Sequence, residues 1–313
     1  MEPVVTLDRF SGVAGAAPSV CREIEAFCED NGKRVGAEYP YTHGYVLGEG
    51  GFVGFAVPGP DRSPLRLDYN PNKDAGAIDE VRERLSTLRP TRLDYAVDYF
   101  GELVSDWMPL RDRVKTMTVR RGGGIVETYQ LGMRSSRLQH VVYDKRRDAE
   151  RKREPVPHGW EGELMRAEAR VRFGPGDAIA VPDDAFDKLS LVSRSAVPGL
   201  PIENRAMLEY LMAHPEEIGE LSKNTRKKYK ALMGSECATI APTPGEVFQG
   251  STEALRAQLF GICDTSARWG RQQGLRVSDG YDSLLSTVHR IGSTLHKIYY
   301  RALLLCETPL SAP

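Results

Sequence analysis

The sequence predicts an α+β protein, with a mostly antiparallel sheet in its N-terminal part and an all-helical C-terminal part. Three stretches with apolar residues at every second position predict the sheet, and the longer apolar period after residue 203 predicts helices. The two patterns meet at a proline-containing stretch near residues 195–200. A length of 313 residues suggests one large domain or two, and we predict two, residues 1–195 and residues 196–313.

The composition is that of a folded globular protein, with 41% hydrophobic and 27% charged residues. A net charge of −1 gives no overall affinity for nucleic acid, so such affinity has to come from local clusters of Lys and Arg. Five scattered cysteines without a Cys-x-x-Cys pair argue against a disulfide framework. With no apolar run long enough for a bilayer, we expect a cytoplasmic protein without a membrane partner.

Four elements are predicted before the three alternating stretches. Residues 20–30 have the apolar spacing of a short amphipathic helix, and residues 45–55 have the form of a hairpin around a glycine turn. Residues 65–69 alternate apolar and polar side chains and therefore predict a third strand. Residues 77–88 predict a second helix, which ends before Pro90.

The alternating stretches themselves are residues 92–100, 126–145 and 163–173. The second contains a polar turn, residues 134–137, and so predicts a hairpin. We place all three in one mostly antiparallel sheet. Because successive strand residues point to opposite sides, the alternation also predicts which side chains share a face.

The C-terminal part predicts helices at residues 203–213 and, over longer stretches, near residues 252–272 and 280–305. We detect no internal repeat and no low-complexity segment. Residues 223–230 are rich in Lys and Arg. This basic stretch could contact phosphate, or it could be a solvated helix face.

The predicted strand at residues 92–100 carries two carboxylates on one face. Asp94 and Asp98 share that face with Ala96, while the opposite face is apolar. Carboxylates are poor strand formers, so this face indicates a cation or a basic partner, with a solvated sheet face as the alternative. The two Cα atoms lie roughly 13 Å apart along a strand, so we do not expect them to bind one ion together.

The stretch at residues 163–173 places one acid among arginines. Arg166, Glu168, Arg170 and Arg172 share a face, and the residues between them are apolar. The row could be a ladder of cross-strand ion pairs. It could equally hold a metal through Glu168 and a phosphodiester through the arginines, whose planar donors suit phosphate.

The hairpin at residues 126–145 brings a tyrosine and a lysine into the densest basic region of the chain. Tyr143 and Lys145 are predicted on one face, with His140 and Asp144 on the other. The surrounding cations are Arg120, Arg121, Arg134, Arg137, Arg146, Arg147, Arg151, Lys152 and Arg153. The region is a suitable footprint for nucleic-acid phosphates, although such a charge run is also typical of a solvated helix start.

A tyrosine beside a lysine and near metal-binding carboxylates has the groups that cleave a phosphodiester. The metal would polarise the phosphate oxygens, a cation would offset the charge of the transition state, and the phenolate would attack phosphorus. A buried structural tyrosine is the alternative. The sequence contains no dinucleotide-binding fingerprint, no Walker-type phosphate loop, no His-Glu-x-x-His and no cysteines at zinc spacing.

Four segments, in this order, resemble a known family. They are residues 91–99, 129–136, 142–145 and 166–172. They look like the replication initiation factor (Rep_trans) family, which contains rolling-circle plasmid initiators, replication proteins of some filamentous phages and relaxases of conjugative elements. The resemblance covers about residues 40–175. It implies a HUH-like or RRM-like sheet core, so that residues 1–195 would be a catalytic nickase domain.

The resemblance implies a sequence-specific, metal-dependent nickase and strand transferase. Such an enzyme cuts one strand at a plasmid origin, stays attached through a tyrosine to the 5′ phosphate, and leaves a 3′ hydroxyl. Tyr143 is the expected nucleophile, with Lys145 beside it and Tyr129 in reserve.

The resemblance also implies the ligand residues. Asp94 and Glu168 are the first choice for Mg²⁺ or Mn²⁺, and Asp98 is the second. Lys145 and Arg170 are second-choice site residues beside them. The cations expected to bind DNA are Arg134, Arg137, Arg166, Arg170, Arg172, Lys227 and Lys228.

The implied partners are origin DNA in double- and single-stranded form, a second copy of the chain and a host helicase. Duplex binding or dimerisation is assigned to residues 196–313. A relaxase that nicks the origin of transfer of a conjugative element is an alternative with the same chemistry. A non-catalytic DNA-binding relative is the other alternative, and it would form neither nicked plasmid nor a covalent adduct.

Overall fold

The computed structural model describes residues 1–37, 40–57, 63–73, 76–85, 88–111, 114–175, 177, 180–194 and 200–263. The strands are β1 (Val4–Ala14), β2 (Gly32–Val35), β3 (Tyr41–Leu47), β4 (Gly51–Ala56), β5 (Leu65–Tyr69), β6 (Arg89–Phe100), β7 (Trp107–Leu110), β8 (Thr116–Arg120), β9 (Val126–Leu131), β10 (Leu138–Asp144), β11 (Leu164–Arg172) and β12 (Ser190–Ser193). The α-helices are α1 (Pro18–Asn31), α2 (Gly76–Glu83), α3 (Lys145–Lys152), α4 (Ile202–Ala213), α5 (Lys223–Glu236) and α6 (Pro244–Cys263). Short 3-10 turns are η1 (Val104–Asp106), η2 (Pro157–Gly159) and η3 (Pro215–Glu220).

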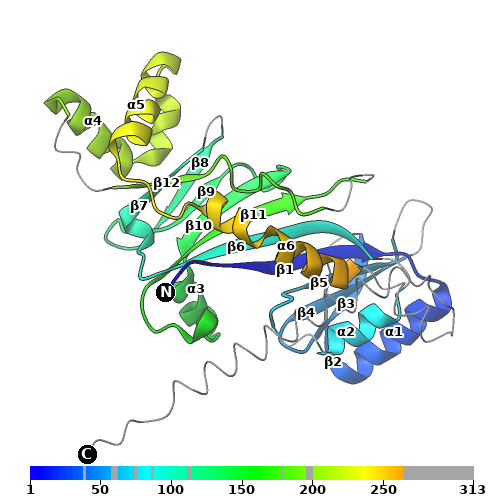
Figure 1. Cartoon of the computed structure of the whole chain (residues 1–313). Coiled ribbons are helices and arrows are strands. Elements are labelled where there is room, and N and C mark those ends of the chain that lie inside the picture. Colours follow the sequence, from blue (N-terminus) through cyan, green and yellow to red (C-terminus); the bar gives the residue numbers. More distant parts are fainter. Residues whose placement is uncertain are drawn as a thin grey trace, which may run out of the picture.

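A ten-stranded sheet forms the centre of the molecule, in the order β2-β3-β4-β5-β1-β6-β11-β10-β9-β8 (Figure 1). Every neighbouring pair in it is antiparallel. Strands β7 and β12 form a separate two-stranded sheet. The predicted α+β class with a mostly antiparallel sheet is therefore confirmed. The three alternating stretches correspond to β6, the β9–β10 hairpin and β11.

The alternation of the sequence does not predict strand β1, because an extra residue interrupts it. Leu7 pairs with Tyr95 of β6, whereas Arg9 pairs with Asp94, so Asp8 is a bulge between the two pairs. Leu7 is consequently buried on one face of the sheet, while Asp8 and Arg9 both line the other face. The bulge therefore places two adjacent charged side chains on the same side of the sheet.

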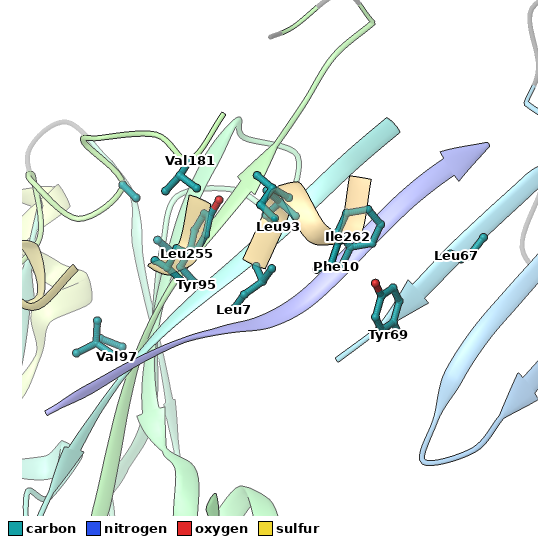
Figure 2. Close-up of a cluster of buried hydrophobic side chains, with 14 of the residues drawn as sticks. Leu7, Phe10, Leu67, Tyr69, Leu93, Tyr95, Val97, Val181, Leu255 and Ile262 are labelled. Carbon is teal, nitrogen blue, oxygen red and sulfur yellow. The ribbon is translucent and has the colours of Figure 1, made fainter. Parts of the chain in front are cut away.

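One face of the sheet carries the main hydrophobic core, which helices α1, α2 and α6 cover. Figure 2 shows Leu255 and Ile262 of α6 over the central strands, beside Leu7, Phe10 and Leu93. Burying a side chain of this size contributes about 1.5–3 kcal/mol, so this layer is a major source of stability. The opposite face of the central strands carries charged side chains, and helix α3 packs against part of it.

A second, smaller core lies beside the sheet. It contains Met108 of β7, Val192 of β12, Leu208 and Leu211 of α4, and Met233 of α5. The small sheet and the helices α4 and α5 therefore pack on one another.

The named elements from residue 202 to residue 263 are helical, as predicted. Helix α4 begins one residue before the predicted start, and α6 begins eight residues before its predicted start at 252. Residues 264–272 and the helix predicted at 280–305 lie outside the described residues. Helix α6, which belongs to the predicted C-terminal part, packs into the main core. The division into residues 1–195 and 196–313 stays a prediction. Across the described ranges, no helix has the length and apolar character needed to span a bilayer.

The ten strands fall into two halves that meet where β1 pairs with β6. Outward from β1 come β5, β4, β3 and β2, and outward from β6 come β11, β10, β9 and β8. In each half the first strand along the chain lies at the centre, and the four later strands lie in reverse chain order outward from it. The sequence shows no repeat at this level, so the repetition belongs to the chain path and not to the residues.

Candidate active site

The open face of the sheet is hollowed into a cleft of about 840 Å³. Strands β1, β3, β4, β5, β6, β9, β10 and β11 and helix α3 contribute side chains to its lining, which includes ten Lys or Arg and six Asp or Glu. Such an excess of positive charge suits a polyanion such as a nucleic-acid strand.

Tyr143 and Glu168 meet on the wall of this cleft. The pairing of β10 with β11 sets Val141 opposite Glu168, so Tyr143 lies one pleat further along on the same face. The Tyr143 hydroxyl donates a hydrogen bond to Glu168 Oε1 at 2.6 Å. Burial and then the neighbouring Glu168 carboxylate raise the pKa of Tyr143 well above its ordinary value. The phenol therefore keeps its proton until a base removes it.

Arg170 holds the second oxygen of Glu168. Its Nε and Nη2 donate to Glu168 Oε2 at 2.9 and 2.8 Å. Burial works against the charge of the guanidinium, but Glu168 keeps the pKa of Arg170 above its ordinary value. This contact orients the carboxylate and leaves Oε1 directed at the tyrosine.

Lys145 follows Tyr143 by two residues but stands on a helix and not on the strand. The Asp144 side chain accepts from the Arg147 backbone N–H at 2.9 Å and caps helix α3, which begins at Lys145. Lys145 Nζ lies 6.0 Å from the centre of the Tyr143 ring and 3.8 Å from Asp148 Oδ2. Burial, followed by nearby positive charge, lowers the pKa of Lys145.

Asp94 also lines the cleft and is only 4% exposed. Its two oxygens accept from Arg92 Nε at 2.7 Å and from Arg92 Nη2 at 2.6 Å. Burial raises the pKa of Asp94 even though Arg92 opposes that shift. Asp94 and Glu168 are therefore both in the cleft, as the sequence predicts, but each is bonded to an arginine of its own strand.

Asp98 and Arg166 form a buried ion pair and are not open to the cleft. Asp98 is 0% and Arg166 is 2% exposed. Arg166 donates to both Asp98 oxygens at 2.6 and 2.7 Å and to Asp8 Oδ1 at 2.6 Å. The sequence predicts Asp98 as a metal ligand and Arg166 as a DNA contact. In the structure the two residues pair with each other, with Asp8 and with His158, whose Nε2 lies 3.1 Å from Asp98 Oδ2. Their predicted roles stay predictions, and the ion pair would have to open for either one.

Tyr129, the reserve nucleophile, lies on the opposite face of the sheet. Its neighbours Thr128 and Gln130 line the cleft, so Tyr129 points into the main core and is 0% exposed. Burial raises the pKa of its hydroxyl. Tyr129 does not line the cleft, whereas Tyr143 does.

The cations predicted to bind DNA are divided between the cleft and other surfaces. Arg134, Arg170 and Arg172 line the cleft. Arg137 has an 81% exposed side chain and forms an ion pair with Asp177. The remaining pair is exposed on helix α5, away from the residues that line the cleft: Lys227 and Lys228.

The first half of the sheet supplies cleft residues that the sequence reasoning missed. Arg9 Nε donates to Asp68 Oδ1 at 2.6 Å, its Nη2 bonds Asp68 Oδ2, and Arg66 Nη2 donates to the same oxygen at 3.1 Å. The strand at residues 65–69 alternates in the same way as residues 92–100. That signal could have identified Arg66 and Asp68, whereas the bulge at Asp8 hides Arg9.

The predicted ligands Asp94 and Glu168 are hard oxygen donors on adjacent strands, a suitable type for Mg²⁺ or Mn²⁺. However, Arg92 bonds both oxygens of Asp94, and Tyr143 and Arg170 bond those of Glu168. Among the residues that the structure describes, no group of three or more His, Cys, Asp or Glu is placed to hold a metal ion. In this arrangement the oxygens of Asp94 and Glu168 are already bonded, so the two carboxylates do not fit a divalent cation.

No protein-family model matches the sequence. Three replication initiation proteins of Staphylococcus aureus are similar to it, with 29% and 28% identity over 185 residues and 27% over 188 residues. A solved rolling-circle replication initiator from Geobacillus stearothermophilus covers 55% of this chain and 75% of its own, with 14% identity and a TM-score of 0.35, a likeness too low to carry an argument.

The chain spans about half the length of the curated relatives it matches, 55% in the first case. The shared half accounts for 55% of this chain too. The resemblance that the four motifs predict is thereby confirmed: over about half of its length this chain is similar to replication initiation proteins.

Proposed function

We propose that this chain is a replication initiator of the rolling-circle type, which nicks one DNA strand at an origin with Tyr143 as the nucleophile. Its relatives are replication initiation proteins by name. The cleft with its excess of Lys and Arg suits the phosphates of a DNA strand. The observation that carries the proposal is the 2.6 Å hydrogen bond from the Tyr143 hydroxyl to Glu168 inside that cleft.

In the proposed reaction Glu168 acts as a general base. Its Oε1 takes the phenolic proton, and the Tyr143 oxygen forms a bond to the phosphorus of the scissile phosphodiester. The bond from phosphorus to the 3′ oxygen breaks, which leaves a 5′ phosphotyrosine and a 3′ hydroxyl. We assign Lys145 as the general acid that gives a proton to the leaving 3′ oxygen, because its lowered pKa favours the loss of that proton.

Positive side chains on the same wall support the transition state. Arg170 and Arg172 follow Glu168 on one face of β11 and line the cleft. Their guanidinium groups are suited to the non-bridging oxygens of a phosphodiester, whose negative charge grows during the attack. Arg134, in the turn between β9 and β10, extends the same positive surface.

The finer predictions are proposals of the same kind. Dependence on Mg²⁺ or Mn²⁺ would require Arg92 or Arg170 to leave its carboxylate, and activity with and without a chelator tests it. Binding of duplex origin DNA is assigned to the helical part that contains Lys227 and Lys228. Dimer formation and a host helicase partner follow from the same resemblance.

A nicking assay tests the proposed function. Supercoiled plasmids that carry overlapping segments of the DNA around the coding sequence are incubated with the protein and Mn²⁺. We expect nicked plasmid and a protein–DNA adduct, with mass spectrometry of the adducted peptide locating the DNA on Tyr143. Tyr143→Phe removes only the hydroxyl and should lower nicking by at least about a thousandfold.

Two outcomes would contradict the proposal in different ways. If no segment is nicked and no adduct forms, the chain is not a nickase under these conditions and the enzyme hypothesis fails. If the adduct persists in Tyr143→Phe, another residue is the nucleophile. Tyr129→Phe is the matched control, because it removes a buried hydroxyl on the other face and should leave nicking intact.

A further inference from the structure

An aromatic side chain stands on the charged face of the sheet, far from Tyr143. Phe52 of β4 lines the cleft and is partly exposed, and it pairs across the strands with Asp68 of β5. Its neighbours along the strand, Gly51 and Val53, are buried. A large apolar ring on a face that otherwise carries charged side chains is not explained by packing in the core, which lies on the other face.

Two glycines make room for the ring of Phe52. Gly44 of β3 and Gly54 of β4 are cross-strand partners. A Cβ on Gly44 would lie 2.4 Å from Phe52 Cε2, and one on Gly54 would lie 2.8 Å from Phe52 Cε1. The ring therefore rests on the backbone of these two strands, and its other face is directed at the cleft.

A second aromatic ring and a cation lie beside it. Tyr41 also lines the cleft, where a register irregularity in β3 between Tyr41 and His43 re-aims it. A Cβ on Gly54 would lie 3.5 Å from Tyr41 Cδ1, so the two rings meet over the same glycine. The guanidinium carbon of Arg66 is 5.9 Å from the centre of the Tyr41 ring.

We propose that Phe52 and Tyr41 form a stacking site for a nucleobase of single-stranded DNA, with Arg66 contacting the adjoining phosphate. Bases stack on exposed aromatic faces in a way that tolerates any sequence, and arginines beside the rings bind the backbone. The site lies in the same cleft as Tyr143. It thus deepens the proposed function, on which the identity of the bound strand rests.

The position of the site indicates which part of the strand it would hold. Five inter-strand steps separate β4 from β10, and at about 4.8 Å each they amount to roughly 24 Å along the sheet. Several nucleotides of single-stranded DNA can span such a path. The stacked base would therefore belong to the flank of the nicked strand and not to the scissile step, and it would hold that flank across the central strands.

A structural role for Phe52 has different consequences. Aromatic rings can stabilise a sheet by covering glycines of a neighbouring strand. Phe52→Leu keeps an apolar cover over Gly44 and Gly54 but removes the stacking face, whereas Phe52→Trp keeps a ring. If Phe52 only covers the glycines, its substitution should change the stability of the protein and not its affinity for bases. If Phe52 stacks a base, Phe52→Leu should lower that affinity.

Affinity for oligothymidylate, measured by fluorescence anisotropy, tests the inference. All proteins carry Tyr143→Phe so that the strand is not cut. We expect Phe52→Leu to weaken binding by about five- to hundredfold, with unchanged dependence on salt, and Phe52→Trp to retain it. An abasic strand of the same length should bind both variants equally. Arg66→Ala should instead reduce the salt slope by about one phosphate contact.

The outcomes separate this inference from the proposed function. Equal affinity of Phe52→Leu and its parent for oligothymidylate overturns the stacking site alone. An equal loss of affinity for the abasic strand also overturns it, because a backbone without bases cannot stack. If the parent binds no single-stranded DNA at all, the stacking site and the proposed cleft both fail.

Discussion

The two halves of the sheet share a strand order but differ in how they treat their charged residues. On the strand next to the centre, the first half has Arg66 and Asp68 and the second half has Arg166 and Glu168, in each case with one residue between the two. Arg66 has a 36% exposed side chain, whereas that of Arg166 is 2% exposed. The first half keeps the arginines Arg9 and Arg66 partly exposed, although their partner Asp68 is buried. The second half fixes its charged groups in place before a ligand arrives.

Because of this difference, the catalytic groups and the groups that bind the DNA strand can lie in different halves of one cleft. A nucleophile and its base work best when their positions are fixed beforehand, as buried and doubly bonded groups are. A strand of variable sequence needs accessible cations and flat rings instead. Tyr143 and Glu168 lie in the fixed half, and Phe52 and Arg66 lie in the open half. The same chain path thus supports two different tasks.

The largest expected effect is on the rate of nicking, when the acidic residue of each half, Glu168 or Asp68, is replaced by its amide. Glu168→Gln should lower the rate by about a hundred- to ten-thousandfold, because the amide cannot take the Tyr143 proton. Asp68→Asn should lower it by less than about fivefold, the size of an ion pair with exposed partners. Initial rates on supercoiled plasmid measure both. Similar losses in the two variants would mean that the halves do not divide the work in this way.

The next effect is on stability, through the arginine of each half. Arg166→Met leaves the buried Asp98 without its arginine, with only His158 Nε2 at 3.1 Å, and should lower the free energy of unfolding by about 3–5 kcal/mol. Arg66→Met removes an exposed contact and should cost less than about 1 kcal/mol. Urea unfolding followed by circular dichroism compares them. A loss of the same size in both would contradict the contrast in burial.

Stability should also depend on pH through a histidine that only the second half buries. His140 of β10 is 0% exposed, its Nε2 lies 2.7 Å from the Ala185 carbonyl, and burial lowers its pKa to about 4. The unfolded chain takes up a proton near the ordinary pKa of 6.5, which the folded protein resists. The contribution is therefore complete above pH 6.5 and is lost as the pH falls towards 4.

The size of this pH effect is about 3 kcal/mol, from a shift of between two and three pH units. Urea unfolding at a series of pH values from 7 to 4 measures it. His140→Phe keeps a ring in the core but cannot titrate, so its free energy of unfolding should fall less over that range. If the variant and the parent have the same slope, His140 is not the group responsible.

Local periodicity predicted much of the fold and of the candidate site. It gave the correct faces for Asp94, Glu168 and Tyr143, because the side-chain period of a strand is two and depends only on neighbouring residues. It did not give Asp8 or Arg9, because a bulge breaks that period where it occurs. The alternation of residues 65–69 was present in the sequence, but nothing local shows that this strand shares a face with Tyr143.

The pattern of the sequence was therefore enough to predict strands β3 to β6 and β9 to β11, their faces and the similarity to replication initiation proteins. The tertiary structure alone decided which charged groups meet. Asp98 and Arg166 are 68 residues apart, and only the pairing of β6 with β11 brings them together as a buried ion pair. Strand order depends on packing across the whole chain, so side chains that read alike in the sequence acquire different partners and different roles.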